Sequence, residues 1–254
     1  MPTNLWVPLS LAAVRELSAG GRLAAWGGAA LAGSVSPDEA ADRVSGPNDP
    51  PHRVLGLPGD AEPVNLPYAL SRLHALGVTG LRLVLPRPGD ATGLPGPPSF
   101  NESAVGRGEA VLTVGGQPLG LLPHGRGTWS VREVKEDRRT PVGVRDAERA
   151  LTSATRDCAA LLERLDVARW EPATAEVLAT GSRAAVLELP LSADPRAHTL
   201  LQHGLRIAAV VDLARSSNGN AVSADEIAAR SAILRDLDAA ARRAIEAACS
   251  VAFD

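Results

Sequence analysis

The strongest fold signal lies in residues 54–85, which read VLGLPGDAEPVNLPYALSRLHALGVTGLRLVL. Two short apolar runs, Val54–Leu57 and Leu81–Leu85, are set off by glycine and proline and predict buried strands. Between them, Leu66–Leu76 repeats apolar residues at spacings of three and four, which predicts an amphipathic helix ending at Gly77. The order strand, helix, strand predicts a βαβ unit whose strands are parallel neighbours joined by a right-handed crossover.

Further strands are predicted C-terminal to this unit. Ala110–Val114 and Gln117–Leu122 flank Gly115-Gly116, the pattern of a β-hairpin with a two-residue turn. Thr128–Val134 alternates in the manner of a strand with one solvated face. The sheet is therefore expected to be mixed, with a parallel pair and antiparallel additions.

Helices are predicted on both sides of the strand-rich region. The N-terminal residues have helical spacing, with a break expected at Gly20-Gly21 and a second helical segment through Leu31. Ser36–Glu39 is a capping box that opens another helix. In the C-terminal half, helices are predicted over Arg145–Val167, from Asp194-Pro195 onward, from a second capping box at Ser223–Glu226, and over 172–180, with an edge strand over 184–189.

These elements predict a mixed α/β, α+β-like fold. A central mixed sheet contains the βαβ unit and the hairpin, with N-terminal helices and a largely helical C-terminal half. The expected organisation is a single domain over residues 1–254. The alternative is a subdivision into a sheet-containing part, residues 1–140, and a helical part, residues 141–254.

The charge of the chain argues against a nucleic-acid partner. The formal net charge is −3, whereas proteins that track phosphates usually have a basic excess. Lys135 is the only lysine among 26 basic side chains, so arginine takes the ordinary surface positions of lysine.

Location is predicted from cysteine content and hydropathy. Cys158 and Cys249 lie far apart in predicted helices, as buried free thiols in a reducing compartment would. The N-terminal residues lack the basic start of a secretory signal, and the longest uncharged stretch, Leu23–Pro37, is too short to span a bilayer. We expect a cytoplasmic protein with no membrane partner.

Several enzyme classes are excluded by missing motifs. No glycine precedes a lysine, so the chain has no P-loop, and no G-x-S-x-G elbow is present. Lys135 lies in a charged run that would not lower its pKa for Schiff-base chemistry. No two histidines have the i, i+4 spacing for a shared metal on one helix face. No cofactor is predicted, and the sequence leaves open whether the protein is an enzyme.

The Pro/Gly-rich loop Pro86–Pro98, PRPGDATGLPGPP, is the best candidate for function. Its prolines and glycines restrict the backbone to few conformations, which predicts an ordered loop. The tetrad Pro-Gly-Asp-Ala occurs in it and also at Pro58–Ala61, each time as a type II turn signature after a predicted strand. If the strands were parallel neighbours, Asp60 and Asp90 would meet at the carboxyl edge of the sheet beside Arg87.

Two carboxylates and a guanidinium could bind Mg²⁺, hold a ligand, or share a proton. The alternative is that each aspartate only hydrogen-bonds its own turn. Phe100 and Asn101, just after the loop, are candidates for fixing it or facing a ligand, with core packing as the other reading of Phe100. His124 lies on a glycine-rich turn between predicted strands and is a candidate for acid–base chemistry.

The run Leu81–Leu112, LRLVLPRPGDATGLPGPPSFNESAVGRGEAVL, with Pro118–Gly120, resembles a family of actinobacterial proteins of unknown function. The shared features are a proline-rich loop, a following Phe-Asn and a Gly-Glu-Ala-Val-Leu strand entry. The resemblance implies restriction to that lineage and transfers no catalytic residue.

Three functions are weighed on these grounds. The favoured one is a binding or regulatory protein that uses the loop to recognise a small ligand or a protein partner. The first alternative is an enzyme with an Asp60/Asp90 pair, with or without Mg²⁺, acting on a phosphorylated or sugar-like substrate. The second is a structural subunit of a homo-oligomer.

Overall fold

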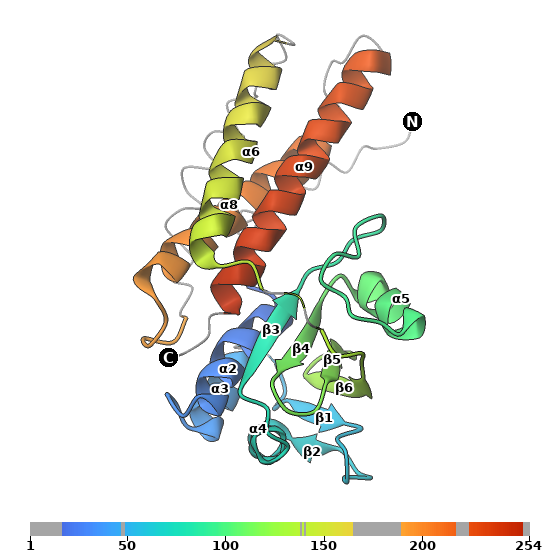
Figure 1. Cartoon of the computed structure of the whole chain (residues 1–254), viewed down its shortest axis with the longest axis vertical. Coiled ribbons are helices and arrows are strands. Elements are labelled where there is room, and N and C mark those ends of the chain that lie inside the picture. The colour runs from blue at the N-terminus through green and yellow to red at the C-terminus, as the bar shows by residue number, and fades with distance from the viewer. Residues whose placement is uncertain are drawn as a thin grey trace, which may run out of the picture.

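A computed structural model describes residues 17–46, 49–137, 139, 141–164, 189–216 and 224–250. A mixed sheet and surrounding helices make up this part of the chain, which confirms the mixed α/β class (Figure 1). The strands are β1 (Arg53–Leu55), β2 (Val64–Asn65), β3 (Gly80–Val84), β4 (Ala110–Val114), β5 (Leu119–Pro123) and β6 (Thr128–Glu133). The helices are α1 (Ala19–Arg22), the π-helical turn η1 (Leu23–Gly27), α2 (Gly28–Leu31), α3 (Pro37–Val44), α4 (Leu66–Ala75), α5 (Pro98–Arg107), α6 (Val144–Arg164), α8 (Pro195–Ser216) and α9 (Ala224–Cys249).

The sheet has the strand order β2-β1-β6-β5-β4-β3. β1 pairs in parallel with β6, and the other neighbouring strands are antiparallel. The predicted hairpin is confirmed as β4 and β5, but the expected two-residue turn is wrong: four residues, 115–118, connect the strands, and Leu112 pairs with Gly120. Gly115 and Gly116 have φ of 72° and 55°, a region that favours glycine. The predicted strand at Thr128 is confirmed as β6.

The predicted parallel pairing of β1 with β3 is wrong. β6, β5 and β4 lie between the two strands, which run in opposite directions. The handedness rule describes how a parallel pair is connected, but it does not decide which strands pair. Here β6 is the better neighbour of β1, because Val54 pairs with Trp129, whose indole Nε1–H donates to His52 Nδ1 at 3.1 Å.

The local signals that begin and end α3 and α4 are confirmed. Ser36 Oγ accepts from Glu39 N at 3.1 Å at the start of α3, as the capping box predicts. α4 begins after Asn65, whose Oδ1 accepts from Tyr68 N at 2.9 Å, and the chain leaves the helix through Gly77 at φ 81°. Both helices match the ranges expected from the sequence.

The predicted helix break at Gly20-Gly21 is also wrong. Both glycines are buried inside a continuous run of helical turns from α1 through η1 to α2. A Cβ on Gly20 would lie 2.5 Å from Oε2 of Glu109, which accepts a hydrogen bond from the backbone N–H of Gly20. These glycines permit close packing of the helix, a role that sequence cannot distinguish from that of a breaker.

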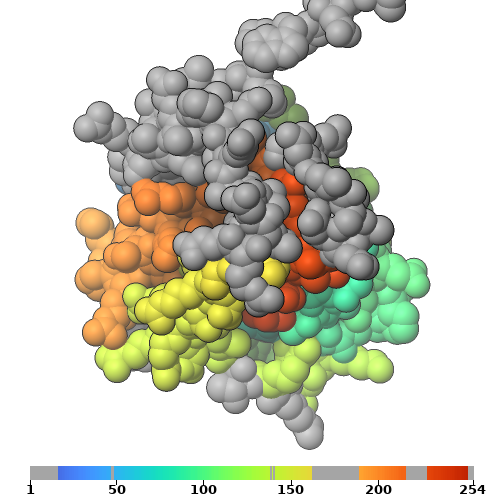
Figure 2. All heavy atoms as spheres, turned by 90° about the horizontal axis from the view of Figure 1, so that it is seen from above, coloured from blue at the N-terminus to red at the C-terminus, as the bar shows by residue number. Residues whose placement is uncertain are grey.

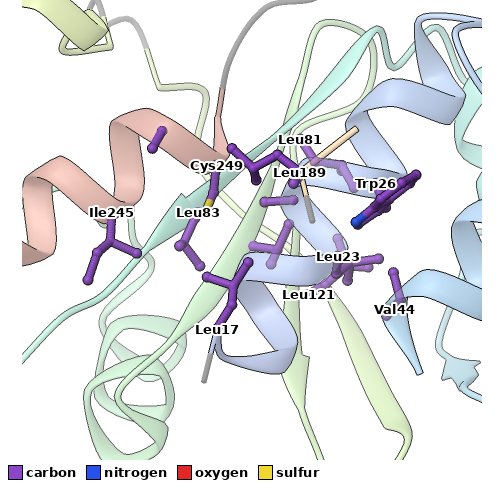
Figure 3. Close-up of a cluster of buried hydrophobic side chains, with 14 of the residues drawn as sticks. Leu17, Leu23, Trp26, Val44, Leu81, Leu83, Leu121, Leu189, Ile245 and Cys249 are labelled. Carbon is purple, nitrogen blue, oxygen red and sulfur yellow. The ribbon is translucent and has the colours of Figure 1, made fainter. Parts of the chain in front are cut away.

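The main core lies between the N-terminal helices, one face of the sheet and the C-terminal end of α9. Figure 3 shows Leu23 and Trp26 of η1, Leu81 and Leu83 of β3 and Ile245 of α9 within this single cluster. All five side chains are buried. The C-terminal helices therefore share a core with the sheet.

A second, smaller core contains α5, which the sequence analysis did not predict. Phe100 of α5 is 1% exposed and packs with Leu94, Leu112 and Leu122. Any side chain on Gly120 of β5 would overlap the Phe100 ring, so the glycine lets the ring reach the sheet. Phe100 thus has the core-packing role and does not face a ligand surface.

The predicted C-terminal helices are confirmed as α6, α8 and α9, which project from the sheet as a bundle (Figure 1). Gly204 of α8 allows a close approach to α9, since a Cβ there would lie 3.2 Å from Ala241 O. Cys158 and Cys249 are buried free thiols, as expected. The predictions for residues 11–16, 172–180 and 184–188, and for the cap at Ser223, lie outside the described residues.

Candidate functional site

Both Pro-Gly-Asp-Ala tetrads form the predicted turns. Asp60 N donates to Leu57 O at 3.0 Å, and Asp90 N donates to Arg87 O at 2.9 Å. Gly59 and Gly89 have φ of 89° and 83°, as a type II turn requires of its third residue. In the second turn Arg87 N also donates to Asp90 O at 2.9 Å, which closes it at both ends.

Asp60 stabilises its own turn against α4. Its Oδ1 accepts from the Tyr68 hydroxyl at 3.1 Å, and its Oδ2 lies 3.4 Å from Arg72 Nε. Arg72 also donates to Pro58 O at 3.2 Å. The Asp60 side chain therefore serves local structure, although its contacts reach α4 and not the turn itself.

The expectation that Asp60 and Asp90 are neighbours is wrong. They follow β1 and β3, which are antiparallel and separated by three strands. Their turns therefore leave the sheet at opposite ends of the strands. The described part of the chain contains no group of three or more side chains that could hold a metal ion. No shared carboxylate site therefore forms from these two residues.

Asp90 reaches across to helix α9. Its Oδ2 accepts from Arg242 Nη2 at 2.7 Å, and its Oδ1 accepts from Thr92 N at 3.2 Å. Burial alone raises the pKa of Asp90, but hydrogen bonds from Arg242 and Thr92 outweigh that effect and lower the pKa to about 2. Asp90 is thus a firmly charged partner of Arg242 at neutral pH. Figure 2 shows the loop region in teal directly against α9 in red.

Arg242 is buried, and all three guanidinium nitrogens have acceptors. Nε donates to Asp238 Oδ2 at 3.0 Å, and Nη1 donates to Leu85 O at 2.7 Å, in addition to the bond from Nη2 to Asp90. The arginine side chain is 6% exposed. A buried guanidinium is tolerated when such partners satisfy it, so Arg242 is fixed by two carboxylates and one carbonyl.

Side chains from α9 and its C-terminal end take the place of a further strand along the edge of β3. Ser250 Oγ accepts from Leu83 N at 2.9 Å, and Glu246 Oε1 accepts from Leu85 N at 2.5 Å. Arg242 donates to the carbonyl of the same Leu85. Four residues of helix rise about 6 Å and two residues of strand about 6.6 Å, so the step from Ser250 to Glu246 matches the step from Leu83 to Leu85. We call Asp238, Arg242, Glu246 and Ser250 the edge stripe.

The edge stripe protects a strand that would otherwise expose unpaired backbone groups. Exposed edges promote pairing with other chains, and natural proteins cover or charge them. The opposite edge strand, β2, spans only Val64–Asn65 and follows Pro63, which has no N–H to donate.

Glu246 has an unusual protonation behaviour in this setting. Burial raises the pKa of Glu246 to about 7, although the Leu85 N–H and the charges of Arg242, Arg82 and Arg243 oppose the rise. Above that pH the contact with β3 includes a charged, partly buried carboxylate. Below it the carboxyl is neutral.

Glu246→Gln is expected to change the pH dependence of stability. The raised pKa means that the folded state binds the proton more tightly, so this contribution to stability is complete below about pH 4.5 and is lost as the pH rises through about 7. Glutamine remains neutral and its Oε1 can still accept from Leu85 N. We expect the variant to gain about 1–3 kcal/mol relative to the native chain between pH 5 and pH 8. Urea unfolding at several pH values measures the difference, and a flat difference across that range would contradict the prediction.

The rest of the Pro/Gly-rich loop is fixed from other directions. Gly93 O accepts from Arg82 Nη2 at 3.2 Å, and the same nitrogen contacts Asp137. Gly96 N donates to Asn101 Oδ1 at 3.0 Å, while Gly96 O accepts from Lys135 N at 3.2 Å. Asn101 therefore fixes the loop, one of the two roles considered for it from sequence.

Arg87 lies against the end of α5, and His124 lies in the turn between β5 and β6. The Arg87 guanidinium lies against Gly108 at the end of α5, since a Cβ on that glycine would be 2.7 Å from Nη1. His124 is exposed in the turn between β5 and β6, and its backbone N–H donates to Thr128 O at 2.7 Å. β5 runs in the same direction as β3. The His124 turn and the Pro/Gly-rich loop therefore leave the sheet at the same end of the strands.

Comparison with protein-family models adds the domain context. Residues 20–147 match the model of the Rv1486c-like protein, N-terminal domain, and residues 145–246 match that of the Rv1486c-like protein, C-terminal domain. The chain belongs to the Rv1486c-like family. This confirms the expected membership of a family of unknown function. No curated protein and no solved structure matched the chain.

The two Rv1486c-like domains meet at the edge stripe. The N-terminal domain contains β3 and the Pro/Gly-rich loop, whereas Asp238, Arg242 and Glu246 belong to the C-terminal domain. Sequence reasoning considered only the apolar positions of α9 and missed these residues. Their signal was the spacing of four between Asp238, Arg242, Glu246 and Ser250 in an alanine-rich helix.

Among the helices of the described part, none is long and apolar enough to cross a membrane.

Proposed function

We propose that this Rv1486c-like protein binds a protein partner through the tip of the Pro/Gly-rich loop, defined as Pro88–Thr92. The observation that carries the proposal is that an exposed tip is attached to a densely bonded base. Pro88, Gly89, Ala91 and Thr92 are exposed, while Asp90 between them is bonded to α9. A loop already in one conformation loses little entropy on binding.

The chemistry of the tip suggests the kind of partner. Its exposed residues are uncharged, and they include the rigid apolar ring of Pro88 and the small side chain of Ala91. Aromatic-lined grooves bind the rings of prolines in extended PxxP segments, and a proline held rigid in a turn offers the same kind of apolar ring. We therefore propose a partner with an aromatic-lined groove. The enzyme alternative relied on an Asp60/Asp90 pair that does not form.

Ala91→Arg is expected to abolish partner binding without affecting stability. Ala91 is exposed, so a long charged side chain there is accommodated in the free protein and obstructs a docked partner. Affinity capture from the native host should retain a partner with the unmodified chain and lose it with the variant, with a fall in affinity of tenfold or more.

The repeated tetrad supplies a matched control for this experiment. Ala61 follows the same Pro-Gly-Asp sequence and is also exposed, but it lies at the other edge of the sheet. Ala61→Arg should therefore bind as the unmodified chain does. Equal loss in both variants, or retained binding by Ala91→Arg, would count against the loop tip as the recognition surface. A photo-crosslinker at position 91 should label the partner, and one at position 61 should not.

We also propose that the protein is cytoplasmic and that its family is restricted to actinobacteria. A cytoplasmic location is supported by the two buried free cysteines, which are typical of a reducing compartment. Restriction of the family to actinobacteria is supported by the loop motif and the arginine-rich composition.

A further inference from the structure

The two Pro-Gly-Asp-Ala turns have the same sequence but different contacts. Asp60 accepts a hydrogen bond from Tyr68 and forms an ion pair with Arg72, both on α4, the helix that follows its turn. Asp90 bonds to Arg242, 152 positions away and in the other Rv1486c-like domain. The second turn is therefore part of the junction between the domains, and the first is not.

Arg242 joins the loop and the end of β3 through one rigid group. The guanidinium is planar, and its donors have fixed relative directions. Since Nη2 bonds Asp90 and Nη1 bonds Leu85 O, a change in the position of the loop must alter the contact with β3 or turn the whole group. Arg242 is 5% exposed, so water offers little replacement for a lost acceptor.

The contacts continue from Arg242 into the helical bundle. Asp238, 4% exposed, accepts from Arg242 Nε through Oδ2, and its Oδ1 lies 3.7 Å from Arg215 Nη1 on α8. Arg215 Nη2 donates in turn to Leu234 O of α9 at 3.5 Å. An unbroken series of polar contacts thus runs from the loop tip to the packing of α8 against α9.

We propose that Asp90 couples the loop tip to the C-terminal helical domain, so that engagement of the loop is transmitted to α9 through Arg242. Coupling between two sites is reciprocal, so the state of α9 also sets the geometry that the loop presents. The biological role of this coupling rests on the proposed function, because the coupling would make partner binding at the loop depend on the state of the helical bundle. The coupling itself is a property of the free protein.

Hydrogen exchange of the full-length chain, followed by mass spectrometry, tests the coupling with Asp90→Asn and Asp60→Asn as a matched pair. Asparagine is nearly isosteric and removes the charge from the bond to Arg242. We expect Asp90→Asn to speed exchange about tenfold in peptides covering 85–93 and also in peptides covering 238–250. Asp60→Asn should speed exchange only around 57–72. α4, which is remote from the junction, should be unchanged in Asp90→Asn.

Two outcomes would overturn the inference. Faster exchange confined to the loop in Asp90→Asn would show that α9 does not respond to it. An equal effect of Asp60→Asn on α9 would show that any loss of stability loosens that helix. If Asp90→Asn folds poorly, Thr92→Val replaces it in the experiment. This variant removes a hydroxyl that hydrogen-bonds Asp90 and should give the same exchange pattern with a smaller effect. The exchange experiment uses the free protein without a partner. Failure to find a partner would therefore refute the proposed function and leave the exchange results unaffected.

Discussion

Arg242→Met is expected to lower the free energy of unfolding by about 3–5 kcal/mol, the usual consequence of removing one member of a buried ion pair. Methionine fills a similar volume but leaves three acceptors without their donor, Asp238 Oδ2, Asp90 Oδ2 and Leu85 O. Asp238 is the most affected, because its side chain is 5% exposed and its remaining cation, Arg215, is 3.7 Å away. Urea unfolding followed by circular dichroism measures the loss.

The neighbouring Arg243→Met is the matched control. Arg243 is exposed on the same turn of α9, so its replacement should change the free energy of unfolding by about 0.5 kcal/mol or less. Equal effects of the two substitutions would mean that the contacts of Arg242 with Asp90, Asp238 and β3 contribute little, and the edge stripe would lose its assigned role.

Phe100→Ala is expected to cost about 3–5 kcal/mol, because it removes the largest side chain from the smaller core and leaves a cavity against Gly120. The glycine cannot fill the space, and the rigid sheet limits collapse around it. The adjacent Asn101 fixes Gly96 of the loop, so movement of α5 should also free the loop. Thermal unfolding measures the first effect, and faster hydrogen exchange at Gly96 measures the second.

Tyr68→Ala provides the comparison for an aromatic residue on a helix. Tyr68 is 45% exposed, and its deletion should cost about 1 kcal/mol or less, mostly from the bond to Asp60. A loss below about 1 kcal/mol for Phe100→Ala would be inconsistent with its place in the core. A large loss without faster exchange at Gly96 would separate the core role of Phe100 from support of the loop.

The edge stripe shows why this protein needs both family domains to complete one sheet. A strand at a sheet edge usually acquires a strand neighbour, a helix lying over it or a blocking charge. In this chain Arg242 and Glu246 of the C-terminal domain, with Ser250 just beyond it, supply a donor and two acceptors to the backbone of Leu83 and Leu85. We expect the N-terminal domain expressed without α9 to have an exposed β3 edge and a strong tendency to aggregate.

The elements predicted most reliably were those specified by neighbours in the sequence. Ser36 and Glu39 are three residues apart, and the cap they predict is present. The two Pro-Gly turns need only four residues each and both form. α5 was missed because Pro97-Pro98 and Gly106 weaken its helical pattern, while the ring of Phe100 packed against Gly120 stabilises it.

The sequence by itself determined the two turns, the mixed α/β class, the hairpin strands and most other elements of the described part, α5 and β2 excepted, because capping, periodicity and turn chemistry act over a few residues. Only the tertiary structure decided that β6 lies beside β1, that Asp60 and Asp90 are at opposite edges, and that Asp90 meets Arg242. Strand pairing and ion pairing join residues far apart in the chain. They depend on which surfaces pack best together, and no local pattern of residues encodes that choice.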